Sequence, residues 1–391
     1  MLSRSLGPGH LIAAGIGCMV GGGIFLTTST LARQYGAPSL LAGYLVAALE
    51  PGAGSAYQYA RASLGHFPSW LIGCALFLEY SFGSAAVAVL WTGNPHYAAG
   101  MVGAATLLLI LGIRVSANVN TALVFLKCGT LIAFIAWIVY WATGHPAVSP
   151  LQGESTAWRS VAGLAVFSYL GFESVSTLGL ECRNPQRDIP IGVIGSLAIT
   201  TLLYLAVIAT YAMVPNPIGD GLLGAALATG AGPVGQLINL CVYVGLSTVL
   251  LIMMMGQSRI FFAMASDGLL PTALRQTHTR TSAPTVAILV TGALVATACL
   301  LIPLQTLYNL AVTGTLIAFT VVAAAIPILR RREPNRPRPF RVPTVWITAP
   351  AAVIVNIVLL SNLATTIVNE LAICFAIACF LWYFARKGIT V

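Results

Sequence analysis

Charged residues are scarce in this sequence, and their scarcity excludes most kinds of soluble protein. Only 7% of the 391 residues are charged, whereas 58% are hydrophobic and the mean hydropathy is +0.89. A soluble domain carries about 25% charged residues, because charge is what covers a surface that faces water. The longest polar run, residues 329–342, is no longer than a loop. The sequence therefore predicts one transmembrane domain over residues 1–391, surrounded mostly by lipid.

The chemical motifs of enzymes and metal sites are missing as well. The eight cysteines contain no CxxC pair, and the sequence has no HExxH, no GxSxG and no paired aspartates in its apolar runs. We therefore expect no enzyme, no metal site and no cofactor, with cysteines serving as small buried side chains. The first apolar run, from His10, lacks the short core and cleavage site of a signal peptide, so we interpret it as a span.

Long apolar runs dominate what is present. A helix needs about 20 apolar residues to cross roughly 30 Å of hydrocarbon. Eleven runs are candidates: 10–32, 69–93, 97–113, 119–142, 159–179, 190–213, 232–262, 284–303, 306–329, 345–366 and 368–386. A further run, 38–49, would reach only about 20 Å as a helix and is too short to cross comfortably. The pattern predicts an all-α polytopic membrane protein.

The lysine and arginine positions indicate an orientation. If the amino terminus is cytoplasmic and run 38–49 counts as a crossing, all of them are cytoplasmic except Arg33 and Arg159, which lie outside, and Lys127, which falls within a span. If run 38–49 does not cross, the first span must have the opposite orientation, because the later charged loops still favour the cytoplasmic side. The net charge of +9 is then a topology signal, and we expect no nucleic acid partner.

Two of the predicted spans contain helix-breaking glycines. The first carries three consecutive glycines, Gly21 to Gly23, and the span 159–179 carries Gly171 followed by Glu173. The glycines of the first span favour either close helix packing or a functional break. Paired interruptions in corresponding spans indicate an inverted-repeat transporter. Amides at the start of one half-helix favour a carboxylate, and carbonyls at the end of another favour an ammonium, so an α-amino acid suits both.

At these residues the chain resembles the amino acid–polyamine–organocation superfamily, and within it the cationic amino acid transporter group. The resemblance runs from about His10 to Arg341 and rests on GIGCMVGGGIF (15–25), PGAGSAYQYA (51–60), LEY (78–80), NVNTALVFLK (118–127), FSYLGFESVST (167–177), NPQRDIPIG (184–192), GQSRIFFAMASDGLLP (256–271) and FRVP (340–343). It implies a LeuT-like fold of 5+5 inverted repeats, with repeat one at about 10–142, repeat two at about 159–329 and two further helices at 345–386.

The resemblance also implies a substrate site between the two interrupted helices. Backbone amides of the first span would bind the substrate carboxylate, and carbonyls of both spans would face its ammonium; Phe167 would close over the substrate as a gate. Glu79 would face the binding region, while Ser247 is a candidate for lining the side-chain pocket. The implied substrate-binding residues are Met19, Gly21, Gly22, Gly23, Phe167, Ser168, Leu170, Glu79 and Ser247.

Lys127 is the residue that most suggests coupling to protons. A lysine in the middle of a membrane is costly unless it has a partner or is neutral. In proton-coupled members of the group, the matching lysine stands where sodium-coupled relatives hold a sodium ion. We therefore expect Lys127 to gain and lose a proton during transport, so that the coupling ion is H⁺. Glu173 is a second candidate for proton coupling, with hydrogen bonding to the backbone as the alternative.

The chain departs from the family at its second helix, which is shortened to about residues 38–50. We predict secondary active transport of an amino acid, proton-coupled and by alternating access, in the cell inner membrane without an obligate protein partner. The alternative is a transport-defective or repurposed homologue that binds an amino acid without flux. Whether the substrate is cationic or neutral is left open.

Overall fold

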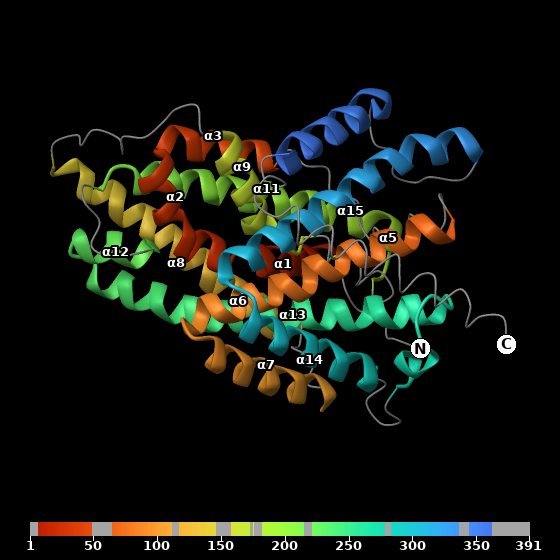
Figure 1. Ribbon diagram of the computed structural model, residues 1–391. Helices are drawn as coiled ribbons and strands as arrows, with labels where there is room; N and C mark the ends of the chain where they lie inside the picture. The colour runs from red at the N-terminus through yellow and green to blue at the C-terminus, as the bar shows by residue number, and fades with distance from the viewer. Residues whose placement is uncertain are drawn as a thin grey trace. The chain divides into compact units, whose positions relative to one another are not determined.

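The computed structural model describes residues 7–48, 65–111, 117–145, 158–172, 175, 182–214, 221–277, 283–335 and 344–361 (Figure 1). Every regular element in these ranges is a helix. Four features predicted from the sequence lie outside the described residues: Glu173, the motifs at 51–60 and 340–343, and the last predicted helix, 368–386.

The described helices follow one another along the chain in the order that Figure 1 shows by colour. They are α1 (Pro8–Met19), η1 (Gly23–Thr27), α2 (Thr28–Tyr35), α3 (Ala37–Ala48), α5 (His66–Phe77), η2 (Leu78–Phe82), α6 (Gly83–Thr92), α7 (Pro95–Ile110), α8 (Ala117–Thr143), α9 (Trp158–Tyr169), α11 (Pro185–Tyr211), α12 (Gly221–Ala228), α13 (Gly232–Ser266), η4 (Thr272–Arg275), α14 (Thr285–Leu301) and α15 (Leu304–Arg332).

Among the described residues, six helical stretches are long and apolar enough to cross a membrane: Pro8–Thr27, His66–Thr92, Thr121–Thr143, Pro185–Tyr211, Gly232–Ser266 and Leu304–Arg332. Four shorter apolar helices accompany them: Ala37–Ala47, Pro95–Ile110, Thr285–Leu301 and Val345–Ser361. Together they confirm the prediction of an all-α polytopic membrane protein. The described residues of α3 number 12 and span about 18 Å, and the shortened second helix stays a prediction because the residues after Ala48 lie outside the described part of the chain.

The chain forms two compact units, each built from two separate stretches of sequence. The first comprises residues 1–50 and 115–249, and the second comprises 51–114 and 250–391. Each unit takes helices from both predicted repeats, so neither unit coincides with one repeat. The single-domain and repeat boundaries stay predictions.

Within the first unit, helices pack reciprocally between the two halves of the chain. The first helix, α1, packs on α11, and α9 packs on α3. Small residues permit the close approach: Gly15 of α1 faces Ser196 of α11, and Gly43 of α3 faces Val161 of α9. The first helix of each predicted repeat thus packs on the second helix of the other, and the inverted repeat itself stays a prediction.

The second unit is built around the continuous rod formed by α5, η2 and α6. Its central π-helical turn, η2, carries Glu79, which is fully buried. Gly314 of α15 packs directly against the backbone of this turn, where a Cβ atom would lie 2.7 Å from the Glu79 nitrogen. The helices α7 and α14 pack on each other through Thr106 and Gly292.

Candidate functional site

The first helix is interrupted where the sequence places its three glycines. The α-helical part ends at Met19, and Val20 takes an extended conformation with ψ 92°. Gly22 returns to the helical region, and the π-helix η1 starts at Gly23. Glycine is a poor helix former, about 1 kcal/mol worse than alanine, so the chain loses little by breaking here. The predicted interruption of the first span is present.

The helix α9 ends in the same manner. Its last helical residue is Tyr169, and the Leu170 amide closes a tight turn on the Phe167 carbonyl at 3.3 Å. Gly171 then adopts φ +98°, a conformation that side chains other than glycine rarely take. The helix therefore ends at the predicted break at Gly171, and residues 173–174 and 176–181, which follow it, lie outside the described part of the chain.

The two interruptions touch each other. A Cβ atom on Gly23 would lie 2.7 Å from the Cα atom of Ser168, and one on Gly171 would lie 2.8 Å from the Cβ atom of Cys18. Real Cβ atoms essentially never approach other atoms so closely, so both positions accept only glycine without movement of their neighbours. Backbone from α1, η1 and α9 is thus brought together at one place in the first unit.

A tyrosine that sequence reasoning missed joins the two helix ends. The Tyr204 hydroxyl, from α11, donates to the Met19 carbonyl oxygen at 2.6 Å and to the Ser168 carbonyl oxygen at 3.0 Å. Both carbonyls lie in the last turn of their helices, where C=O groups lack an intrahelical partner. The signal was available, because a tyrosine fourteen residues inside a span needs a partner for its hydroxyl.

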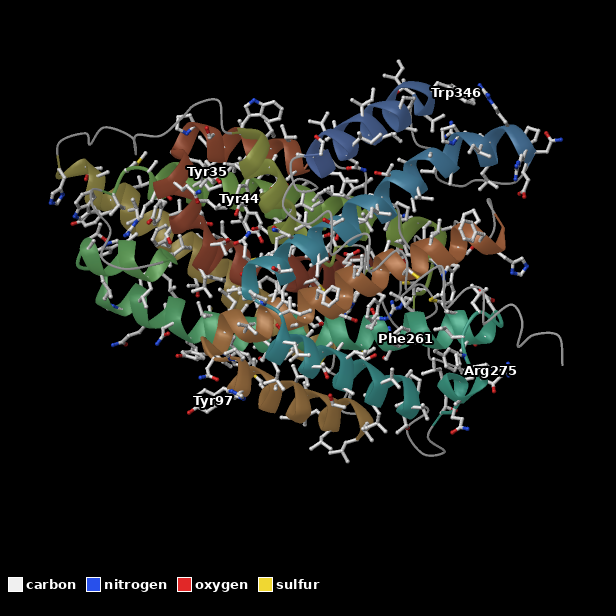
Figure 2. All side chains as sticks on the ribbon, viewed as in Figure 1. Tyr35, Tyr44, Tyr97, Phe261, Arg275 and Trp346 are labelled. Carbon is white, nitrogen blue, oxygen red and sulfur yellow. The ribbon has the colours of Figure 1, made fainter. Side chains whose placement is uncertain are left out.

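Tyr204 belongs to a cluster of three buried tyrosines. Its ring centroid lies 5.7 Å from that of Tyr44 and 5.3 Å from that of Tyr169. Tyr44, marked in Figure 2, comes from α3 and is fully buried, and its hydroxyl is hydrogen-bonded to the Ser168 Oγ at 2.9 Å. Two hydroxyls of the cluster therefore bond to Ser168: that of Tyr44 to its side chain and that of Tyr204 to its carbonyl oxygen.

Lys127 anchors the first half-helix to its neighbours. The side chain is 1% exposed, so its amine lies inside the protein and not at the protein surface. Its Nζ atom donates to the Gly17 carbonyl at 2.9 Å, to the Gly245 carbonyl at 3.3 Å and to the Thr248 Oγ1 at 3.1 Å. An ammonium has three N–H donors, and all three find acceptors here. A side chain of α8 thus joins α1, just before its break, to α13.

The remaining predicted residues are placed less directly. Phe167 is buried, and Gly21 packs against Val249 of α13, where a Cβ atom would lie 3.2 Å from a Val249 methyl. Ser247 is half-buried on α13, whereas its neighbour Thr248 contacts Lys127. Glu79 lies in the second unit. Roles in substrate binding or proton coupling stay predictions for all of these residues.

The described residues contain no group of three or more His, Cys, Asp or Glu side chains that could hold a metal ion. What the first unit offers instead is backbone: the amides at the start of η1 and the carbonyls at the ends of α1 and α9, positions where a helix has no intrahelical partner of its own to give. Such a set of fixed partial charges is suited to holding the two charged ends of a small zwitterion.

Comparison with known proteins gives concordant matches. The family described as amino acid permease matches residues 6–385. A branched-chain amino acid permease, BcaP, of Bacillus subtilis (strain 168) is 32% identical, covering 95% of this chain and 90% of that protein. A methylthioribose transporter of the same organism is 31% identical, covering 88% of this chain and 85% of the relative.

A vacuolar cationic amino acid transporter of Arabidopsis thaliana, transporter 2, is 31% identical, covering 85% of this chain and 61% of its own length. The alignment with the bacterial branched-chain permease runs over 425 positions, more than the 391 residues of this chain. That relative therefore carries segments with no counterpart here.

Proposed function

Because this chain belongs to the amino acid permease family, we propose that it carries an amino acid across a membrane by secondary active transport. Permeases are not enzymes, so the prediction of a non-enzymatic, multi-pass membrane protein is confirmed at that level. The finer proposal is that transport is coupled to protons, proceeds by alternating access and takes place in the cell inner membrane.

The observation that carries the proposal is the contact between two interrupted helices. The amides from Gly21 to Gly23 begin the second half of the first helix, and amides at a helix start attract a carboxylate. The Met19 and Ser168 carbonyls end two helices and attract an ammonium. An α-amino acid carries both groups on one carbon, so one molecule can engage both sets.

Lys127 supplies the proposed link to protons. When charged, its amine donates three hydrogen bonds, and when neutral it has only two N–H groups and a lone pair. Loss of a proton must therefore break or weaken at least one of the bonds to Gly17, Gly245 or Thr248. Since Gly17 lies two residues before the break, the protonation state of Lys127 would alter how firmly α1 is held against α13.

The named relatives span several substrates: branched-chain amino acids, cationic amino acids and, in one case, methylthioribose. The backbone groups at the two breaks recognise what all α-amino acids share, and not their side chains. We therefore propose an α-amino acid as the substrate class, with L-leucine, L-alanine and L-lysine as the first compounds to test.

Uptake into proteoliposomes tests the proposal directly. Purified protein should accumulate at least one of the three labelled amino acids when the lumen is alkaline relative to the outside, and a protonophore should abolish accumulation. Lys127→Met, which keeps a long side chain, should fold and lose the dependence on the gradient. Accumulation that is unchanged by collapse of the gradient would refute proton coupling.

Absence of any flux would refute transport by this chain, and thermal shift with the same amino acids would then show whether it binds them at all. The short α3 makes this control worth performing, because α3 packs on α9 and so supports one of the two interrupted helices.

A further inference from the structure

The Tyr204 hydroxyl bonds to the same carbonyls that the proposed function assigns to the substrate ammonium. It lies 2.6 Å from the Met19 oxygen and 3.0 Å from the Ser168 oxygen. These two residues are 149 positions apart in the sequence and end two different helices. A single hydroxyl from α11 therefore bridges both halves of the candidate site.

The Tyr204 hydroxyl has fewer protons than the two carbonyls can accept. A tyrosine hydroxyl has one proton, so it can donate one full hydrogen bond, or two weaker ones when the proton is shared. A substrate ammonium has three N–H donors and satisfies both carbonyls better. The hydroxyl is thus a donor that the ammonium can outcompete.

The surrounding side chains hold the hydroxyl close to its carbonyls. Tyr204 is fully buried, and its ring packs edge-on against Tyr44, with an angle of 82° between the ring planes, and against Tyr169. Tyr44 is itself held by its bond to the Ser168 side chain. Because neighbouring rings pack against the Tyr204 ring, a large swing of that ring would disturb them, and the hydroxyl is held at its carbonyls in this structure.

We propose that Tyr204 is a positioning residue that supplies, in the unloaded carrier, the hydrogen-bond donor that the ammonium supplies in the loaded carrier. This inference rests on the proposed transport function. A carrier that accumulates substrate must return without it, and during that return its two helix-end carbonyls pass through a state sealed from water. The Tyr204 donor keeps them from being left unsatisfied in that state.

Two transport assays on Tyr204→Phe separate this role from a general structural one. Net uptake requires return of the unloaded carrier, whereas exchange of labelled for unlabelled amino acid does not. We expect exchange to stay within about threefold of wild type and net uptake to fall by about tenfold, the ratio expected for one hydrogen bond lost at a buried carbonyl. The probe is whichever of L-leucine, L-alanine and L-lysine the wild type transports.

Tyr44→Phe is the matched control, because it removes a buried hydroxyl from the same cluster that bonds to a side chain and not to the carbonyls. It should change exchange and net uptake by the same factor. Equal loss of both activities in Tyr204→Phe, or loss of neither, would overturn the proposal.

A binding measurement tests, without any transport assay, whether the Tyr204 hydroxyl competes with the substrate ammonium. The affinity of Tyr204→Phe for the amino acid, measured by calorimetry in detergent, should equal or exceed that of wild type because no hydroxyl competes with the ammonium. Weaker binding would overturn the inference. If wild type binds but shows no flux, the proposed transport function fails, and the binding comparison still decides whether Tyr204 competes with the amine.

Discussion

The Nζ atom of Lys127 donates to the Gly17 carbonyl oxygen at 2.9 Å, two residues before α1 ends. The same amine reaches Gly245 and Thr248 on α13. One side chain of α8 therefore ties an interrupted helix to an uninterrupted one beside the interruption. Substitution of Lys127 should therefore alter the position of the backbone at the break after Met19, where the proposed substrate site lies.

Replacing Lys127 by methionine and by alanine should separate packing from charge. Methionine keeps a long apolar side chain, and removal of a buried charge offsets much of the lost hydrogen bonding. Alanine leaves a cavity that costs about 2–5 kcal/mol. We expect Lys127→Met to unfold near the wild-type temperature and Lys127→Ala well below it, as measured by scanning fluorimetry in detergent.

Both Lys127 variants should lose the dependence of uptake on the pH gradient. If Lys127→Met still concentrated its substrate in response to the gradient, the lysine would serve packing alone, and another group would have to carry the proton.

Gly23→Ala should weaken amino acid binding. The added methyl would lie 2.7 Å from the Ser168 Cα atom, and backbone cannot move aside as a side-chain tip can. The two interrupted helices must then separate, and we expect affinity to fall by about tenfold or more, equivalent to at least about 1.4 kcal/mol. Calorimetry in detergent measures this. Gly9→Ala, on α1 before the break and with nothing within 4 Å, is the control and should bind as wild type does.

Gly171→Ala should lower thermal stability more than Gly93→Ala. Both glycines have positive φ, +98° and +64°, so each substitution carries a conformational cost of about 1–2 kcal/mol. Only at Gly171 does the new methyl also meet a neighbour, the Cys18 Cβ at 2.8 Å, whereas Gly93 has nothing within 4 Å. Unfolding temperatures in detergent give the comparison.

A second substitution tests the cause. Cys18→Gly removes the atom that the Gly171→Ala methyl meets, and the next Cys18 atom, Cα, lies at an ordinary 3.8 Å. The double variant combines Gly171→Ala with Cys18→Gly. Its unfolding temperature, compared with that of Cys18→Gly alone, should fall by about as much as Gly93→Ala lowers that of wild type. If the double variant lost as much stability as the two single variants together, the Gly171→Ala methyl would not clash with Cys18.

The interruptions were predictable because their causes are local. Three consecutive glycines break a helix wherever they stand, and the positive φ at Gly171 is a property of that residue type. The need of Lys127 for partners was predictable too, since the cost of a mid-membrane charge does not depend on which residues satisfy it. Local chemistry therefore predicted where the helices end and which residue needs partners, but not the contacts between the helices.

The contact made by Tyr204 depends on how α11 is rotated, and hydropathy says little about rotation in a helix that is apolar on every side. Close packing decides it: Gly15 of α1 faces Ser196, and Gly192 of α11 faces Leu11. With these contacts in place, Tyr204 lies two helical turns beyond Ser196, on the face toward α1. A single sequence does not reveal which small residues meet across two helices.

Thr248 tests whether the hydrogen bonds of Lys127, and not its mere presence, matter for transport. The Thr248 hydroxyl accepts from the lysine at 3.1 Å and donates to the Gly245 carbonyl at 2.8 Å, so its one proton and one of its lone pairs are both used. Thr248→Val keeps the shape and removes both bonds. A hydrogen bond to a charged group contributes about 1.5–3 kcal/mol, so gradient-driven uptake should fall by about tenfold or more. Thr248→Ser restores the hydroxyl and should restore most of the rate, which initial-rate measurements in proteoliposomes would show. Should Thr248→Val transport as well as Thr248→Ser, the two backbone carbonyls alone would suffice to hold the lysine, and the α13 side chain would have no part in coupling.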